Sequence, residues 1–95
     1  MTGTVEQTLT GKTALVTGAV RRSGRATALE LAKYGASIAI NTRQSVDEAN
    51  LVKTELEALG VKAGVFICDV TNEQGVADMV AKISEELGPV DILVN

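Results

Sequence analysis

Residues 15–26 read Leu-Val-Thr-Gly-Ala-Val-Arg-Arg-Ser-Gly-Arg-Ala, and this segment is the most informative part of the sequence about the fold. An apolar run stops at Gly18, and a second glycine, Gly24, precedes residues that favour a helix. Glycine adopts backbone angles that other residues avoid, and it lets a helix and a strand approach each other closely. The pattern predicts a strand, a tight turn and a helix that begins after Gly24. Two arginines, Arg21 and Arg22, stand inside the turn.

Four short apolar runs, rich in β-branched residues, recur along the chain. They do not alternate polar with apolar residues, which is typical of strands buried on both faces of a parallel sheet. The runs are residues 13–17 (TALVT), 37–41 (SIAIN), 64–68 (GVFIC) and 91–94 (DILV).

Three segments with apolar residues at steps of three and four separate these runs and predict helices. Residues 26–34 end before Gly35, which suits the left-handed position after a helix. The second segment starts with Ser45-Val46-Asp47-Glu48 and the third with Thr71-Asn72-Glu73-Gln74, and both have the form of a capping box. Residues 1–95 are therefore expected to form one α/β domain, the first half (β-α-β-α-β-α-β) of a Rossmann-type doubly wound parallel sheet.

The composition excludes several classes of protein. A net charge of −3, with one Tyr and one Phe, opposes a nucleic-acid-binding surface. No apolar run approaches the roughly 20 residues that span a bilayer, and the polar amino terminus lacks the pattern of a secretory signal. We therefore expect a cytoplasmic protein without membrane or nucleic-acid partners. There is no histidine, which removes Ser-His-Asp catalysis and the commonest metal ligand, and the single Cys68 is interpreted as a packed thiol.

The turn after the first run is the predicted ligand site. In an open parallel α/β sheet, ligands bind beyond the carboxyl ends of the strands. The N–H groups at a helix start also favour an anionic pyrophosphate. The sequence therefore assigns cofactor binding to the turn residues Gly18, Arg21, Arg22, Ser23 and Gly24.

The end of the second run carries no carboxylate. A site specific for NAD usually has an Asp or Glu there, which bonds the ribose 2′-hydroxyl. This chain reads Asn41-Thr42-Arg43 instead, and an arginine favours the 2′-phosphate of NADP. We expect Arg22 to reach the same phosphate, and Arg21 to lie toward the adenine or toward solvent. The alternative is that the arginines of the turn form an exposed basic face.

At this point the residues resemble the classical short-chain dehydrogenase/reductase family, over nearly the whole chain. LTGKTALVTGA, at residues 9–19, is similar to the family's first strand and the opening of its glycine motif. Asp69-Val70 resembles the pair that contacts the adenine ring, and DILVN, ending at Asn95, resembles the start of the Asn-Asn-Ala-Gly segment. Arg22 replaces the middle glycine of the motif, as in NADPH-dependent pteridine reductases and 3-oxoacyl reductases.

The resemblance implies NADP as cofactor and hydride transfer between NADPH and a ketone or similar carbonyl substrate, in a dimeric or tetrameric enzyme. Family catalysis rests on a serine and a Tyr-x-x-x-Lys pair, and no such pair occurs in the 95 residues, where Tyr34 is interpreted as a helix-end residue. We assign no catalytic residue and expect a chain truncated after its fourth strand, inactive alone and completed by a complementary C-terminal polypeptide. Two alternatives remain: a non-catalytic nucleotide-binding module, and a methyltransferase using S-adenosylmethionine, against which the positive turn speaks.

Overall fold

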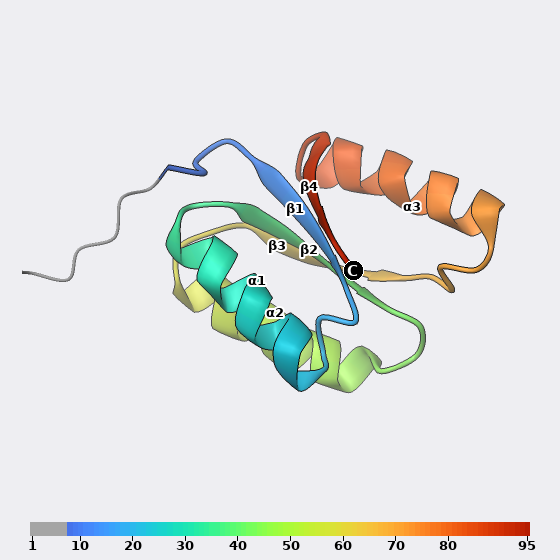
Figure 1. The fold of residues 1–95 in the computed structure, drawn as a ribbon, viewed down its shortest axis with the longest axis horizontal. Helices are drawn as coiled ribbons and strands as arrows, with labels where there is room; N and C mark the ends of the chain where they lie inside the picture. Colours follow the sequence, from blue (N-terminus) through green and yellow to red (C-terminus); the bar gives the residue numbers. More distant parts are fainter. Residues whose placement is uncertain (1–7) are drawn as a thin grey trace, which may run out of the picture.

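The computed structural model describes residues 8–95 as alternating strands and helices (Figure 1). This order confirms the expected first half of a doubly wound sheet. Residues 1–7, which form part of the polar amino terminus, lie outside the described residues. The strands are β1 (Thr13–Thr17), β2 (Ser37–Thr42), β3 (Ala63–Ile67) and β4 (Val90–Val94), and the helices are α1 (Arg22–Lys33), α2 (Val46–Ala58) and α3 (Glu73–Glu86).

The strands form one parallel sheet in the order β3-β2-β1-β4. The chain moves outward from β1 to β3 and then returns to place β4 on the other side of β1. The strand order therefore reverses between β1 and β4, and this reversal is the topological switch point at which such sheets bind ligands.

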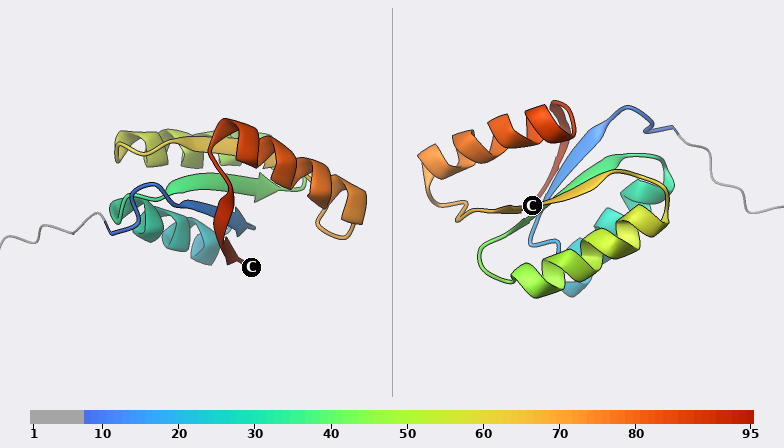
Figure 2. Two further views of the ribbon diagram at one scale, coloured as in Figure 1. Left: turned by 90° about the horizontal axis from the view of Figure 1, so that it is seen from above. Right: turned by 180° about the vertical axis from the view of Figure 1, so that it is seen from behind.

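Helices α1 and α2 cover one face of the sheet, and α3 covers the other (Figures 1 and 2). Successive residues of a strand point to opposite faces. Val16 and Ile40 accordingly join the cluster under α1 and α2, while Leu15 joins Phe66 and Ile83 on the α3 side. A sheet covered on both faces needs continuous apolar strands, which explains the runs without alternation.

The starts of α1 and α2 differ from the sequence expectation. Helix α1 begins at Arg22, before Gly24 and not after it, because the tight turn is complete by then. Ser45 does precede α2, but its side chain makes no capping hydrogen bond within the described part of the chain. Its N–H instead donates to Oγ1 of Thr42 (3.2 Å), so the predicted capping box is wrong here.

Helix α3 is capped by Asn72 and not by Thr71. The Asn72 Oδ1 accepts a hydrogen bond from the N–H of Gly75 (3.0 Å). The Thr71 hydroxyl donates to the Asp69 carboxylate instead. The predicted capping box is therefore wrong: Gly75 stands where its Glu or Gln would be, and a single cap forms at Asn72 because Asp69 engages the Thr71 hydroxyl.

Candidate cofactor-binding site

An open cavity of about 720 Å³ lies at the carboxyl ends of the strands, around the start of α1. It spans the switch point, because Thr17 of β1 and Val94 of β4 both line it and are joined by a hydrogen bond from the Thr17 Oγ1 to the Val94 carbonyl (3.3 Å). All of the predicted cofactor-binding residues except Arg22 line this cavity: Gly18, Arg21, Ser23, Gly24, Asn41, Thr42, Arg43, Asp69, Val70 and Asn95.

The glycine turn has the geometry that the sequence predicted. Gly18 has a φ of +65°, in the left-handed region that a side chain disfavours. The Arg21 N–H donates to the Gly18 carbonyl (3.0 Å) and closes the turn. No side chain of the described residues caps the start of α1 at Arg21, so the first backbone N–H groups of the helix stay available beside the cavity. This combination fits an anionic pyrophosphate.

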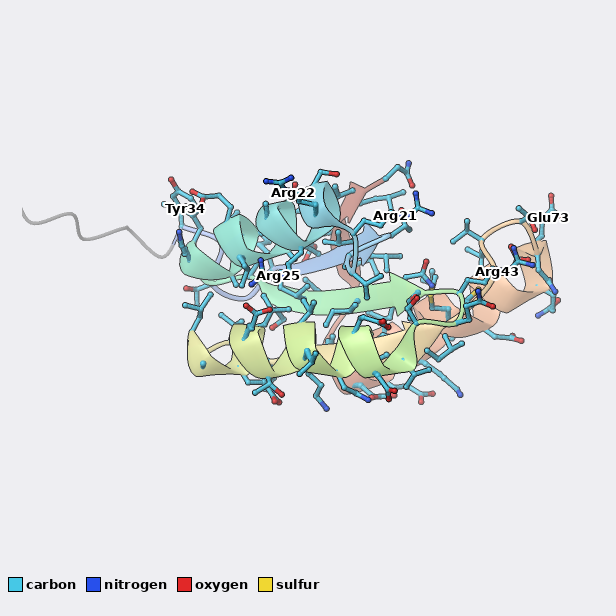
Figure 3. All side chains as sticks on the ribbon, turned by 90° about the horizontal axis from the view of Figure 1, so that it is seen from below. Arg21, Arg22, Arg25, Tyr34, Arg43 and Glu73 are labelled. Carbon is cyan, nitrogen blue, oxygen red and sulfur yellow. The ribbon has the colours of Figure 1, made fainter. Side chains whose placement is uncertain are left out.

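The arginines of the turn have three different positions. Arg21 is exposed and lines the cavity, as Arg43 does at the end of β2. Arg22 lies outside the cavity, on the side of α1 that faces away from Arg43 (Figure 3). The reason is that α1 already begins at Arg22, so helical geometry directs this side chain outward. Arg25 donates from Nε to Oε1 of Glu55 (2.8 Å) and so links α1 to α2.

Arg43 lies against Asp69 at the edge of the cavity, with 3.6 Å between the Arg43 Nε and the Asp69 Oδ2. The other carboxylate oxygen, Oδ1, accepts hydrogen bonds from the Thr71 hydroxyl (2.7 Å) and the Thr71 N–H (2.9 Å). These two bonds, the side-chain bond foremost, hold the pKa of the Asp69 carboxyl below its usual range, and the charge of Arg43 acts in the same direction. Asp69 is therefore an oriented anion inside an otherwise cationic cavity.

Asn41 differs from the other predicted residues because its side chain is buried. Its Nδ2 donates to the carbonyl oxygens of Phe66 and Cys68 (both 3.2 Å) and contacts Sδ of Met79. The amide thus ties β2 to β3 on the α3 side of the sheet. Cys68 is partly buried and packs against the same side, so it is less deeply buried than a core thiol.

Sequence reasoning missed several residues that line the cavity: Thr17, Val20, Thr27, Gln44, Ser45, Cys68 and Val94. Thr27 lies one helical turn after Ser23 and donates from Oγ1 to its carbonyl (3.0 Å), so four-residue spacing would have found it. Thr17 and Val94 are the last residues of neighbouring strands, a position that the strand prediction already supplied.

Other chemistry lies away from the cavity. Tyr34, the single tyrosine of the chain, follows the end of α1 at the opposite end of the sheet from Arg43 (Figure 3). Within residues 8–95, no three His, Cys, Asp or Glu side chains gather into a group that could hold a metal ion. None of the helices in the same range is long and apolar enough to cross a bilayer.

Comparison with known proteins matches residues 12–95 to the family model described as short chain dehydrogenase. Gluconate 5-dehydrogenase of Gluconobacter oxydans is 45% identical over 89 residues, which cover 92% of this chain and 34% of that protein. The chain thus spans about a third of the length of the curated relatives that it matches.

Two solved structures share the fold and carry different nucleotides. A short chain dehydrogenase from Burkholderia cenocepacia in complex with NADP is 41% identical, with a TM-score of 0.86 over 93% of this chain and 36% of that one. A 7α-hydroxysteroid dehydrogenase complexed with NADH is 37% identical, with a TM-score of 0.85 over 100% of this chain and 37% of that one. The chain therefore belongs to the short-chain dehydrogenase/reductase family and matches its N-terminal, NAD(P)-binding Rossmann portion.

Proposed function

We propose that the chain binds NADPH, as the cofactor-binding part of an oxidoreductase that acts on a ketone or similar carbonyl group. The observation that carries this proposal is that Arg21 and Arg43 line the same cavity, while β2 ends without the carboxylate of an NAD-specific site. Cations at this edge suit the 2′-phosphate that distinguishes NADPH from NADH. Solved relatives carry either NADP or NADH, so membership of the family does not distinguish the two nucleotides. The choice of NADPH is supported by the arginines.

Each part of the cavity has a proposed role toward the cofactor. Gly18 and Gly24 let the backbone approach the pyrophosphate, and the start of α1 supplies N–H donors. Val70 is half exposed and, beside Asp69, offers an apolar surface for the adenine ring. Asn95, across the switch point, borders the region left for the rest of the dinucleotide. When bound, the nicotinamide supplies the hydride.

The activity of the whole protein is also a proposal. The relatives that the chain matches are named as dehydrogenases and reductases, which supports an enzyme acting on a small carbonyl or hydroxyl compound. We propose a cytoplasmic dimer or tetramer in which a complementary C-terminal polypeptide supplies the catalytic tyrosine and lysine. The intact mass of the purified protein tests this: a single species near 9.9 kDa that reduces carbonyl compounds would refute the complementary polypeptide.

The decisive experiment compares the dissociation constants of NADPH, NADH and S-adenosylmethionine by calorimetry on the full-length protein. We expect NADPH to bind at least about tenfold more tightly than NADH, because charge-assisted bonds to a phosphate separate the two. Equal affinities would refute the preference for NADPH. Tighter binding of S-adenosylmethionine would refute the oxidoreductase. Tight NADPH binding without turnover of any carbonyl compound would favour a non-catalytic binding module.

A further inference from the structure

Asp69 is the one acidic residue among the described residues that line the cavity, and a carboxylate beside Arg43 competes with any phosphate that Arg43 binds. We propose that Asp69, oriented by Thr71, is the counter-ion with which Arg43 forms an ion pair until a nucleotide binds. On this inference, Asp69 and Thr71 determine how strongly the site prefers a 2′-phosphate over a 2′-hydroxyl. The inference rests on the proposed NADPH function and deepens it.

The parallel pairing of β2 and β3 fixes the backbone positions of Arg43 and Asp69 relative to each other. The ladder continues past the strand ends, where the Cys68 N–H donates to the Thr42 carbonyl (3.0 Å). The buried Asn41 amide adds a bond to the Cys68 carbonyl (3.2 Å). Arg43 follows directly on β2, and Asp69 stands two residues beyond the end of β3, so the two residues leave the same edge of the sheet close together. The two residues are close because β2 pairs with β3, and not only because two surface side chains happen to touch.

The two partners differ in how firmly they are held. The Asp69 Oδ1 accepts both hydrogen bonds from Thr71, which leaves Oδ2 directed at Arg43. Rotating this carboxylate would break both bonds. Arg43 has no comparable restraint, since 76% of its side chain is exposed against 40% for Asp69. The carboxylate is thus the fixed partner, and the guanidinium is the one that moves.

A 2′-phosphate can displace Asp69 from Arg43, and a 2′-hydroxyl cannot. An ion pair at 3.6 Å between exposed side chains is weak and screened by solvent. A phosphate offers up to two negative charges and three acceptor oxygens to the same guanidinium. Arg43 therefore exchanges Asp69 for the phosphate of a 2′-phosphorylated nucleotide, but stays on Asp69 when the nucleotide carries a hydroxyl. Asp69 therefore lowers the affinity for the 2′-phosphorylated nucleotide only, and so reduces the preference of the site for a 2′-phosphate over a 2′-hydroxyl.

The test uses adenosine 2′,5′-bisphosphate and adenosine 5′-monophosphate as probes of the full-length protein. Any contact of Asp69 with the adenine is common to both probes and cancels in the ratio of their dissociation constants. We expect Asp69→Asn to raise the preference for the bisphosphate about two- to five-fold. Thr71→Val keeps the charge but releases the carboxylate, so it should raise the preference by a smaller factor. Glu73→Gln removes a carboxylate outside the cavity and should leave the ratio unchanged.

Asp69→Asn in an Arg43→Ala background distinguishes two explanations: exchange of Arg43 between Asp69 and the phosphate, and direct repulsion of the phosphate by Asp69. If Asp69 acts through Arg43, Asp69→Asn changes nothing there. An equal rise in both backgrounds would mean that Asp69 merely repels the phosphate, and would overturn the inference. So would an unchanged ratio in Asp69→Asn while Arg43→Ala still abolishes the preference, which would leave the NADPH proposal intact. A wild-type protein with no preference for the bisphosphate would overturn both.

Discussion

A Cβ atom added at Gly24 would lie 2.3 Å from the carbonyl oxygen of Gly18. The obstructing oxygen belongs to the backbone of the turn, so no side chain can rotate to make room. The contact brings the first turn of α1 directly onto the end of β1, and it places the N–H groups of the helix at the cavity. The close approach of these two glycines therefore sets where the start of α1 meets the cavity.

Replacing Gly24 by alanine should therefore displace α1 from β1. We expect a loss of about 3 kcal/mol in the free energy of unfolding, at the upper end of overpacking costs, because the obstructing atoms are backbone. Gly75→Ala is the matched control, since its added Cβ would meet the Cys68 Sγ at an ordinary 3.4 Å inside the first turn of α3. That variant should be neutral or more stable by up to about 1 kcal/mol. Chemical denaturation measures both, and equal losses would contradict the steric argument.

Arg43→Ala should weaken NADPH by about tenfold while leaving NADH nearly unchanged, because Arg43 is proposed to meet only the 2′-phosphate. Arg21→Ala should weaken NADPH more than NADH, since its side chain lines the same cavity. Arg22→Ala is the control, because it removes the same charge one residue along, outside the cavity. Calorimetry of each variant with NADPH and with NADH measures these changes in affinity. A loss in Arg22→Ala equal to that in Arg43→Ala would show that charge alone matters, and not position.

Asn41→Ala should destabilise the fold by about 1–3 kcal/mol, because it removes buried bonds to two carbonyl oxygens of the β3 end. It should also raise the preference for NADPH slightly, since the amide helps to hold Asp69 beside Arg43 and that contact lowers the preference. Asn50→Ala, an exposed asparagine in α2, should leave both quantities unchanged. Thermal unfolding combined with nucleotide titration checks the pair. Unaltered stability in Asn41→Ala would refute the role assigned to the amide.

The Arg25–Glu55 pair between α1 and α2 should make stability depend on pH. The hydrogen bond from Arg25 lowers the pKa of the Glu55 carboxyl below 4.5, and the positive charge of Arg25 adds to this effect. A lowered pKa in the folded protein means that the unfolded chain takes up the proton first. The stabilisation is therefore complete above pH 4.5 and is lost as the pH falls through the folded pKa.

Glu55→Gln should flatten this acid limb in thermal unfolding followed from pH 7 to pH 3. Asp69 has a lowered pKa as well, so part of the acid sensitivity should remain in the variant. Glu57→Gln, an exposed position on the same helix, is the matched control and should retain the wild-type profile. Identical profiles for the two variants would mean that the Arg25–Glu55 contact contributes nothing to stability.

The strands were predictable because each carries its own signal. Residues 13–17 form β1 as expected; β2 and β4 are each one residue longer at one end than predicted, and β3 is shifted by one residue toward the amino terminus. An apolar run without alternation depends only on local sequence and on burial of both faces. Helix starts were less predictable. Asn72 caps α3 because the Thr71 hydroxyl bonds Asp69, a choice that the capping pattern alone does not contain.

The βα order, the glycine turn and the position of the cavity could be predicted from the amino-acid sequence, because topology brings the carboxyl ends of parallel strands to one edge. Which side chains enter that cavity depends on how the elements pack together. Arg21 and Arg22 are neighbours of identical chemistry, and the residue at which α1 begins sends only Arg21 inward. Arg43 and Asp69 are distant in sequence and meet through the pairing of β2 with β3. Side-chain direction depends on helix phase and strand register, which local composition does not specify.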